Sequence, residues 1–533
     1  MSNPNDASPG LARSAATVSI AVMFSRVLGL IREQVFAALF GAGYAYDAFV
    51  VAFRIPNLLR DLFGEGALSA AFVAVFSDYN ATRSKEDTWR LASNVLCFFA
   101  VAVSIIVLLA ALSAGWIVSV LAHDFAASPG KLALTETMTV IMMPFLLFIS
   151  LAAVVMGMLN TKGKFFVPAL ASSFFNLGSI IGGTSLAFIL PTYGQPAIVG
   201  MACGTLIGGF LQLAVQVPTL KKTGFRFKPT LRLTDPGLVR ILKLMVPATI
   251  GLSATQINIF INTNFAASCA EGSVSWLNYA FRLVQLPIGL FGVAISIAAL
   301  PVLARQVSLG NTEEMKQTFV SSLALVFCLT VPATIGLVLL SEQIIGIIFE
   351  HGAFSALDTR ATAVALSLYA VGLFAYSANK VIVPVFYAIN AARYPVIGSF
   401  GAIGVNIIIV LLTIDAYQHK AIALSTSITM IVNFIFLATV LYVKIGGFSV
   451  RYLGAGLLKI SGAGIVMGSA LFYVRSVFSP YVSSSLLPQV AFLLLLIVSA
   501  ALLYGALLRL FGLPELNSVL AVIGRMRSRF RSR

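Results

Sequence analysis

The sequence predicts an all-α, polytopic membrane protein with about fourteen transmembrane helices. Of its 533 residues, 59% are hydrophobic and only 10% are charged, with a mean hydropathy of +0.97. Soluble domains carry roughly 25% charged residues. Apolar runs of about twenty residues, the length that crosses a bilayer as a helix, alternate with short polar loops. Such runs are too long and continuous for the strands of a barrel, the other structure that can span lipid.

The predicted spans follow one another along most of the chain. They cover residues 14–40, 47–78, 91–122, 134–160, 167–190, 197–219, 237–267, 275–304, 318–340, 360–390, 395–414, 421–443, 452–474 and 487–511. Because Met1–Gly10 is polar and the first apolar run is long, we expect no cleavable signal peptide.

Basic residues alternate between the loops. Twenty-five of the 35 fall on one side of the predicted membrane, 4 on the other and 6 within spans. The positive-inside rule then predicts that both termini are cytoplasmic. The net charge of +16 is thus a topological signal and gives no reason to expect nucleic-acid binding. The basic tail, 513–533, is expected to lie beside anionic headgroups as a topology anchor.

An internal repeat predicts two lobes. A shift of 228 residues superposes Ala52-Phe53-Arg54 on Ala280-Phe281-Arg282, and a shift of 230 superposes Asn176 on Asn406. Repeated halves are typical of transporters, which hold the substrate between them. Two six-helix lobes related by a pseudo-two-fold axis, plus two further helices, are therefore expected. Their boundaries are an N-terminal lobe 1–220, a cytoplasmic linker 221–236, a C-terminal lobe 237–445 and spans thirteen and fourteen within 446–512.

Six basic residues lie inside hydrophobic spans: Arg26, Arg32, Arg54, Arg60, Arg282 and Lys380. A charge at mid-bilayer costs about 2.5–3.5 kcal/mol on insertion scales, so such residues usually face a bundle interior or a watery cavity. Arg32 and Arg60 lie nearer span ends, where they could equally be structural residues that snorkel.

The second span carries a charged stripe. At 100° per residue, its polar residues share one helix face: Asp47, Arg54, Asn57, Asp61 and Glu65. An internal ladder of ion pairs is one interpretation, but it leaves Arg26 and Arg282 unexplained. Surplus arginine in a cavity favours an anionic ligand, and the guanidinium fork suits phosphate.

No motif for chemistry accompanies these charges. The sequence has no Walker loop, catalytic triad or metal cluster, and its four cysteines are scattered as packing residues are. Transport without catalysis, and without a cofactor or metal, is the favoured class. Asn258 and Asn262 lie one turn apart and suit a sodium site, although hydrogen bonding between helices is the stronger expectation.

Four stretches of the sequence carry a recognisable pattern: FSRVLGLIREQVFAALFGAG at 24–43, DAFVVAFRIPNLLRDLFGEGALSAAFVAVF at 47–76, SVSWLNYAFRLVQLPIGLFGVAIS at 273–296 and NKVIVPVFYAIN at 379–390. These stretches resemble a known family, the MurJ (MviN) lipid II flippases of the multidrug/oligosaccharidyl-lipid/polysaccharide exporter superfamily. The resemblance covers essentially the whole chain. It implies two six-helix lobes around a cationic cavity and two extra helices that form a groove for the lipid tail.

The resemblance also implies roles for individual residues. Arg26, Arg32, Arg54 and Arg282 would line the cavity and bind the diphosphate of lipid II, with Asp47 and Glu65 in the same charged set. The chain departs from the family pattern at Asp61, where a basic residue is expected, and at Phe281 and Gln285, where acids are common.

We therefore expect a flippase that moves the undecaprenyl-diphosphate-linked peptidoglycan precursor to the periplasmic leaflet of the bacterial inner membrane by alternating access. A flippase for another polyprenyl-diphosphate oligosaccharide and a multidrug exporter of the same superfamily are the alternatives. Membrane potential is the expected driving force, with sodium as the alternative. Membrane lipids and the cell-wall synthesis machinery are the other expected partners.

Overall fold

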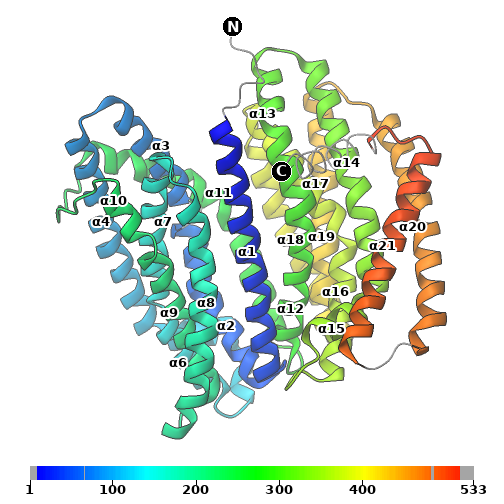
Figure 1. Cartoon of the computed structure of the whole chain (residues 1–533), viewed down its shortest axis with the longest axis horizontal. Helices are drawn as coiled ribbons and strands as arrows, with labels where there is room; N and C mark the ends of the chain where they lie inside the picture. The colour runs from blue at the N-terminus through cyan, green and yellow to red at the C-terminus, as the bar shows by residue number, and fades with distance from the viewer. Residues whose placement is uncertain (1–8, 65–66, 482–484, 516–533) are drawn as a thin grey trace. The chain divides into compact units, whose positions relative to one another are not determined.

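The computed structural model describes residues 9–64, 67–481 and 485–515, and all the regular secondary structure in this part of the chain is helical (Figure 1). Its backbone contacts divide it into two compact units, Met1–Ser275 and Trp276–Arg533. Glu65 and most of the basic tail lie outside the described residues.

The first unit contains the helices up to α11 and the first turn of α12. They are α1 (Pro9–Phe40), α2 (Tyr44–Leu59), η1 (Arg60–Gly64), α3 (Ala67–Thr82), α4 (Lys85–Leu112), α5 (Ala114–Leu121), η2 (His123–Ala127), α6 (Lys131–Met142), α7 (Phe145–Thr161), α8 (Phe166–Ile189), η3 (Leu190–Tyr193), α9 (Ala197–Ala214), α10 (Val217–Lys222) and α11 (Pro236–Ala267).

The second unit contains the remaining helices. They are α12 (Ser273–Pro287), η4 (Ile288–Val293), α13 (Ala294–Ser308), α14 (Thr312–Leu339), α15 (Ser341–Phe349), α16 (Ala356–Val371), α17 (Leu373–Ala388), α18 (Arg393–Tyr417), α19 (His419–Lys444), α20 (Val450–Phe478), η5 (Ser479–Tyr481) and α21 (Leu486–Leu510).

The order of elements repeats between the units. The run α2–η1–α3–α4–α5 has the same sequence of helix types as α12–η4–α13–α14–α15. Both η1 and η4 are π-helical, and they begin 228 residues apart. The two matching asparagines, Asn176 and Asn406, are both buried and both make hydrogen bonds. The internal repeat in the sequence thus corresponds to a repeat of local structure.

The predicted spans correspond to the helices in order. In the described residues, ten helical segments are long and apolar enough to cross a membrane, and two bent pairs raise the number to twelve. The two predicted spans outside that number are α1 and the broken helix α2–η1–α3. These helices carry six of the charged residues singled out above that the structure describes: Arg26, Arg32, Asp47, Arg54, Arg60 and Asp61. The fold is thus an all-helical, polytopic membrane fold, although fewer than fourteen helices meet the length and hydropathy requirement.

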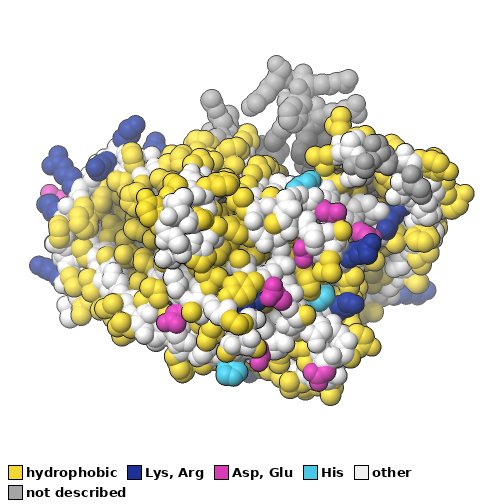
Figure 2. Space-filling model, turned by 90° about the horizontal axis from the view of Figure 1, so that it is seen from below, with side chains coloured by type: hydrophobic (Ala, Val, Ile, Leu, Met, Phe, Trp, Pro, Cys, Tyr) yellow, Lys and Arg dark blue, Asp and Glu magenta, His cyan; other side chains and the backbone are white. Residues whose placement is uncertain are grey.

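Large apolar side chains are exposed along the spanning helices, as a lipid-facing surface requires. Leu112, Leu412 and Leu458 are more than three-quarters exposed. Figure 2 shows apolar side chains over much of the visible surface. The buried cores are also apolar, so the inside and outside of this fold differ little in hydropathy.

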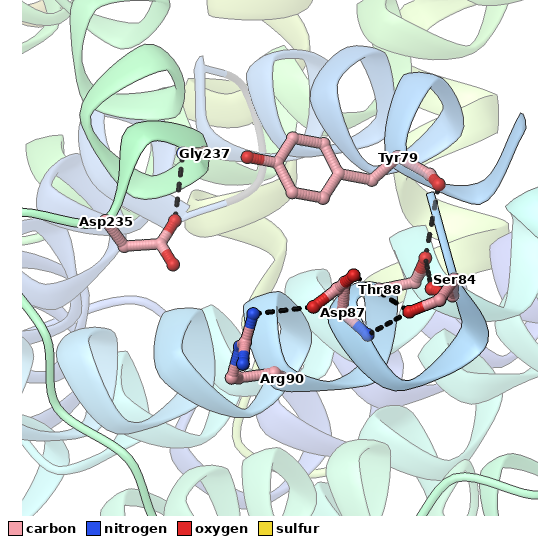
Figure 3. Close-up of polar contacts among 7 residues, drawn as sticks. All are labelled: Tyr79, Ser84, Asp87, Thr88, Arg90, Asp235 and Gly237. Atoms are coloured by element: carbon pink, nitrogen blue, oxygen red, sulfur yellow. Dashed lines mark hydrogen bonds and ion pairs between the residues drawn. The ribbon is translucent and has the colours of Figure 1, made fainter. Parts of the chain in front are cut away.

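The segment between α10 and α11 packs against the first unit. Both amide atoms of Asn94 on α4 pair with the backbone of Arg232, at 2.9 and 2.7 Å. Asp235 caps α11 by accepting from the backbone N–H groups of Gly237 and Leu238, and Ser84 caps α4 nearby (Figure 3). The sequence-based lobe boundary assigns α11 to the C-terminal lobe, whereas α11 packs on α3 and η1 within the first unit.

Candidate functional site

A cavity of about 380 Å³ lies inside the first unit, between α2, α4, α5 and α11. Its polar lining comes from Arg54, Asn57, Ser113 and Gln256, and the rest is apolar: Ile55, Leu58, Leu59, Ile106, Leu109, Ala110, Ile117, Leu121, Ile259 and Phe260. Arg54 is the only charged side chain among these described lining residues. A cation in an apolar cavity favours an anionic ligand because the low dielectric strengthens its field.

The α-helix that carries Arg54, α2, ends beside the cavity, a few residues after Arg54. Pro56 lies within α2, and the helix passes into the π-turn η1 at Arg60. Proline removes a backbone donor and a π-turn inserts an extra residue, so both loosen the regular helix at this point. Of the predicted stripe, Asp47, Arg54 and Asn57 therefore lie in the α-helix α2, whereas Asp61 lies in the π-helix η1.

Asp61 lies beside the cavity and is already paired. Its carboxylate accepts from Arg60 Nη2 at 2.9 Å and from Gln256 Nε2 at 3.1 Å. The stripe therefore does contain a neutralised pair, Arg60–Asp61, next to Arg54. Through Gln256, this pair also connects η1 with α11, the helix on the opposite side of the cavity.

Arg32 takes part in the packing of α1. It pairs with Glu33 at 2.7 Å, and Glu33 accepts from the Tyr46 hydroxyl at 2.8 Å. The Arg32 guanidinium also lies 5.3 Å from the ring centre of Phe175 and 5.9 Å from that of Phe36. Stacking and pairing of this kind stabilise a partly buried arginine.

Asp47 is buried elsewhere and does not line the cavity. Its carboxylate lies 3.1 Å from Lys131 Nζ and accepts from the backbone N–H groups of Gly272 and Ser275 and from the Ser275 hydroxyl. Asp47 thus caps the start of α12 while neutralising a buried lysine. Lys131 lies between the predicted spans 91–122 and 134–160, and its only signal in the sequence is that it is one of the 4 basic residues on the sparsely charged side.

The other sequence-predicted residues are spread over both units. Arg26 is exposed on α1, with no ion pair to any described residue. In the second unit, Arg282 is half-buried on α12 and Lys380 is exposed on α17. Asn258 and Asn262 are half-buried on α11. Among the described residues, no group of histidine, cysteine and carboxylate side chains could hold a metal ion.

Comparisons with known proteins agree in assigning the family. The family model described as "Lipid II flippase MurJ" matches residues 36–492. Probable lipid II flippases of this family from Vibrio cholerae and Haemophilus influenzae are each 33% identical, over 94% and 92% of this chain and 96% and 98% of theirs.

Solved structures extend the comparison to the fold. A lipid II flippase MurJ in an inward closed conformation matches with a TM-score of 0.76 and 29% identity, over 93% of this chain and 98% of that one. An inward-facing multidrug transporter of the MATE family matches with a TM-score of 0.65 at 15% identity, over 81% of this chain and 98% of that one, which shows a shared fold alone. The chain is a multi-pass membrane transporter and belongs to the MurJ family of lipid II flippases.

Proposed function

We propose that this protein carries lipid II from the cytoplasmic to the periplasmic leaflet by alternating access between two lobes. The lobes would be 1–220 and 237–445, joined by the linker 221–236, with 446–512 holding the lipid tail. Family membership supports the cargo, and the repeated order of elements supports the two-lobe division. Both termini would be cytoplasmic, as the distribution of basic residues predicts.

The observation that carries the proposal is the position of Arg54 in an otherwise largely apolar cavity. A lipid-linked diphosphate offers both chemistries that this lining suits, an anionic group for the guanidinium and apolar chain for the leucine and isoleucine side chains. Asn57 and Gln256 can donate further hydrogen bonds to phosphate oxygens. We propose that Arg26, Arg32 and Arg60 contribute to the same cationic site and that Arg282, the repeat counterpart of Arg54, contributes from the second lobe.

Complementation tests this proposal directly. In cells depleted of their own flippase, Arg54→Ala and Arg282→Ala should each abolish growth rescue while the protein still inserts. Arg54→Lys should retain part of the activity because the charge remains. Arg240→Ala is the matched control, since Arg240 is an exposed arginine of the first unit that pairs with Asp78.

The readout is the accessibility of lipid II at the outer leaflet, measured together with protein level in the membrane. Full rescue by both alanine variants would refute the anion site. Normal lipid II exposure without growth, or rescue only of another lipid-linked oligosaccharide pathway, would favour the alternative cargo. Efflux of cationic drugs would favour the exporter alternative.

Membrane potential would drive transport, with a sodium site at Asn258 and Asn262 as the alternative. An association with the cell-wall synthesis machinery would place the flippase beside the enzymes that consume its cargo.

A further inference from the structure

The second unit contains a separate polar cavity of about 640 Å³. It lies where the turn between α17 and α18 meets the end of α19 and the start of α14. Its lining residues are Val307, Thr312, Met315, Ile389, Asn390, Ala391, Arg393, Tyr394, Lys444 and Ile445. None of these belongs to the cavity of Arg54 or to the cationic residues of the proposed transport site.

Two cations converge on one tyrosine at this cavity. Arg393 Nη2 donates to the Tyr394 hydroxyl at 3.1 Å, and the guanidinium lies 4.9 Å from the ring centre. Lys444 Nζ lies 5.5 Å from the same ring centre. Neither Arg393 nor Lys444 forms an ion pair with any described carboxylate. Two like charges held near one ring repel each other, and an anion between them would relieve that repulsion.

Further donors surround the pair. Asn390 adopts a left-handed backbone conformation, with φ of 54°, and lines the wall of the cavity. Thr312 opens the 28-residue helix α14, whose N-cap residue Asn311 makes no side-chain cap. The two acids of that first turn are not in the lining: Glu313 pairs with Lys316, and Glu314 accepts from Asn311. The N-terminal end of the α14 backbone dipole therefore lies at the cavity, and the carboxylates of its first turn lie outside the lining.

The matching corner of the first unit is arranged differently. Lys162 follows α7 there, near Asn160, which the shift of 230 residues superposes on Asn390. Its amine donates to Asn80 and lies 4.9 Å from the ring centre of Trp89. Partial burial, with a contribution from Lys85, lowers the pKa of Lys162. In the first unit, the side chains of Asn80 and Trp89 thus interact with the Lys162 amine. In the second unit, Arg393 and Lys444 line a cavity instead.

The cavity also lies at the ends of two candidate membrane-spanning helices, where lipid headgroups are expected. Arg393 begins one membrane-spanning helix and Lys444 ends the next, and both are on the side rich in basic residues. Val443 and Ile397, which lie beside these two residues on their helices, are 75% and 54% exposed. An acyl chain can cover such apolar side chains while a headgroup enters the cavity.

We propose that this second-unit cavity binds a phosphate-bearing anionic group between Arg393, Lys444 and Tyr394. The phosphate of an anionic phospholipid or free phosphate could supply this group. Such a site would make the stability of the second unit depend on the bound anion, separately from the transport site.

A ligand titration of the purified, full-length protein tests the proposal. The unfolding midpoint is followed in micelles with short-chain phosphatidylglycerol, phosphatidylcholine or inorganic phosphate. Stabilisation by phosphatidylglycerol alone identifies a lipid headgroup as the source, and equal stabilisation by inorganic phosphate identifies a soluble anion. No stabilisation by either anion would overturn the proposal.

Variants locate the site. The double variant Arg393→Gln, Lys444→Gln should weaken anion binding on the order of tenfold or more, because two charge-assisted contacts are lost. The charge-conserving Arg393→Lys should keep most of the binding and shows that the site tolerates substitution. Arg451→Gln removes an exposed charge from the first turn of α20, the helix that follows α19, outside the cavity lining, and should leave binding unchanged. Equal losses in Arg451→Gln and the double variant would mean a diffuse surface charge and would reject the site.

Discussion

Asp47 and Lys131 form a buried ion pair in the first unit, with Nζ and Oδ2 3.1 Å apart and both side chains no more than 3% exposed. The remaining acceptor capacity of Asp47 is used by two backbone N–H groups and a hydroxyl at the start of α12. This buried pair, with its remaining hydrogen bonds satisfied, joins α2, α6 and the start of α12. Removing only one of the two residues would leave the other as an uncompensated buried charge.

Asp47→Ala should therefore destabilise the protein by about 3–5 kcal/mol, the usual consequence of leaving a buried lysine without its partner. Unfolding of the detergent-purified protein measures this directly. The double variant Asp47→Ala, Lys131→Met should recover much of the stability, because it removes the orphaned charge as well. An Asp47→Ala protein as stable as wild type, yet inactive, would instead place Asp47 among the residues that act on the cargo.

The packing of α8 on α9 depends on glycine. A Cβ built on Gly204 would lie 2.4 Å from Gly183 Cα and 2.8 Å from the Ser179 carbonyl oxygen. Gly204→Ala should destabilise by about 1–3 kcal/mol through overpacking against backbone that cannot move aside. Gly404→Ala is the matched control, because a Cβ on this helical glycine of α18 meets nothing within 4 Å. Equal unfolding midpoints for the two variants would contradict the close approach.

Topology can be tested with single cysteines in a background without the four native ones. Ala127 and Lys222 are exposed in η2 and α10. Because the basic loops define the cytoplasmic side, Ala127→Cys should react with a membrane-impermeant maleimide in intact cells. Lys222→Cys should react only after the membrane is opened. Labelling of both from outside would rule out the predicted orientation.

Membrane potential should govern the direction of flipping. The cytoplasm is electrically negative, so outward movement of an anionic diphosphate releases about 2.3 kcal/mol per charge per 100 mV. Collapsing the potential at a constant proton gradient should stop transport in proteoliposomes. If a sodium gradient sustains flipping at zero potential, sodium is the coupling ion and the membrane potential is not the driving force. The asparagines Asn258 and Asn262 would then be the sodium site, and Asn262→Ala should remove the sodium dependence of flipping.

The membrane class, the order of spans and the family could be predicted from the sequence, because each depends on local signals. The length of an apolar run shows directly whether it can cross a bilayer, and the number of basic residues in a loop indicates the side of the membrane on which that loop lies. The repeat was visible because matching residues, such as Arg54 and Arg282, keep nearly one spacing. The fourteen-span count was less secure at α1 and α2–η1–α3, where charged residues interrupt the apolar pattern that defines a span.

The partners of the charged residues were decided only by the tertiary structure. The stripe on the second span placed Asp47 and Arg54 on one helix face, yet Asp47 pairs with Lys131 while Arg54 lines a cavity with Gln256 of α11. Helical periodicity fixes the direction of a side chain, but it carries no information on which distant helix lies opposite. Which partner or cavity each charged side chain meets depends on that neighbour, and hence on how the helices pack.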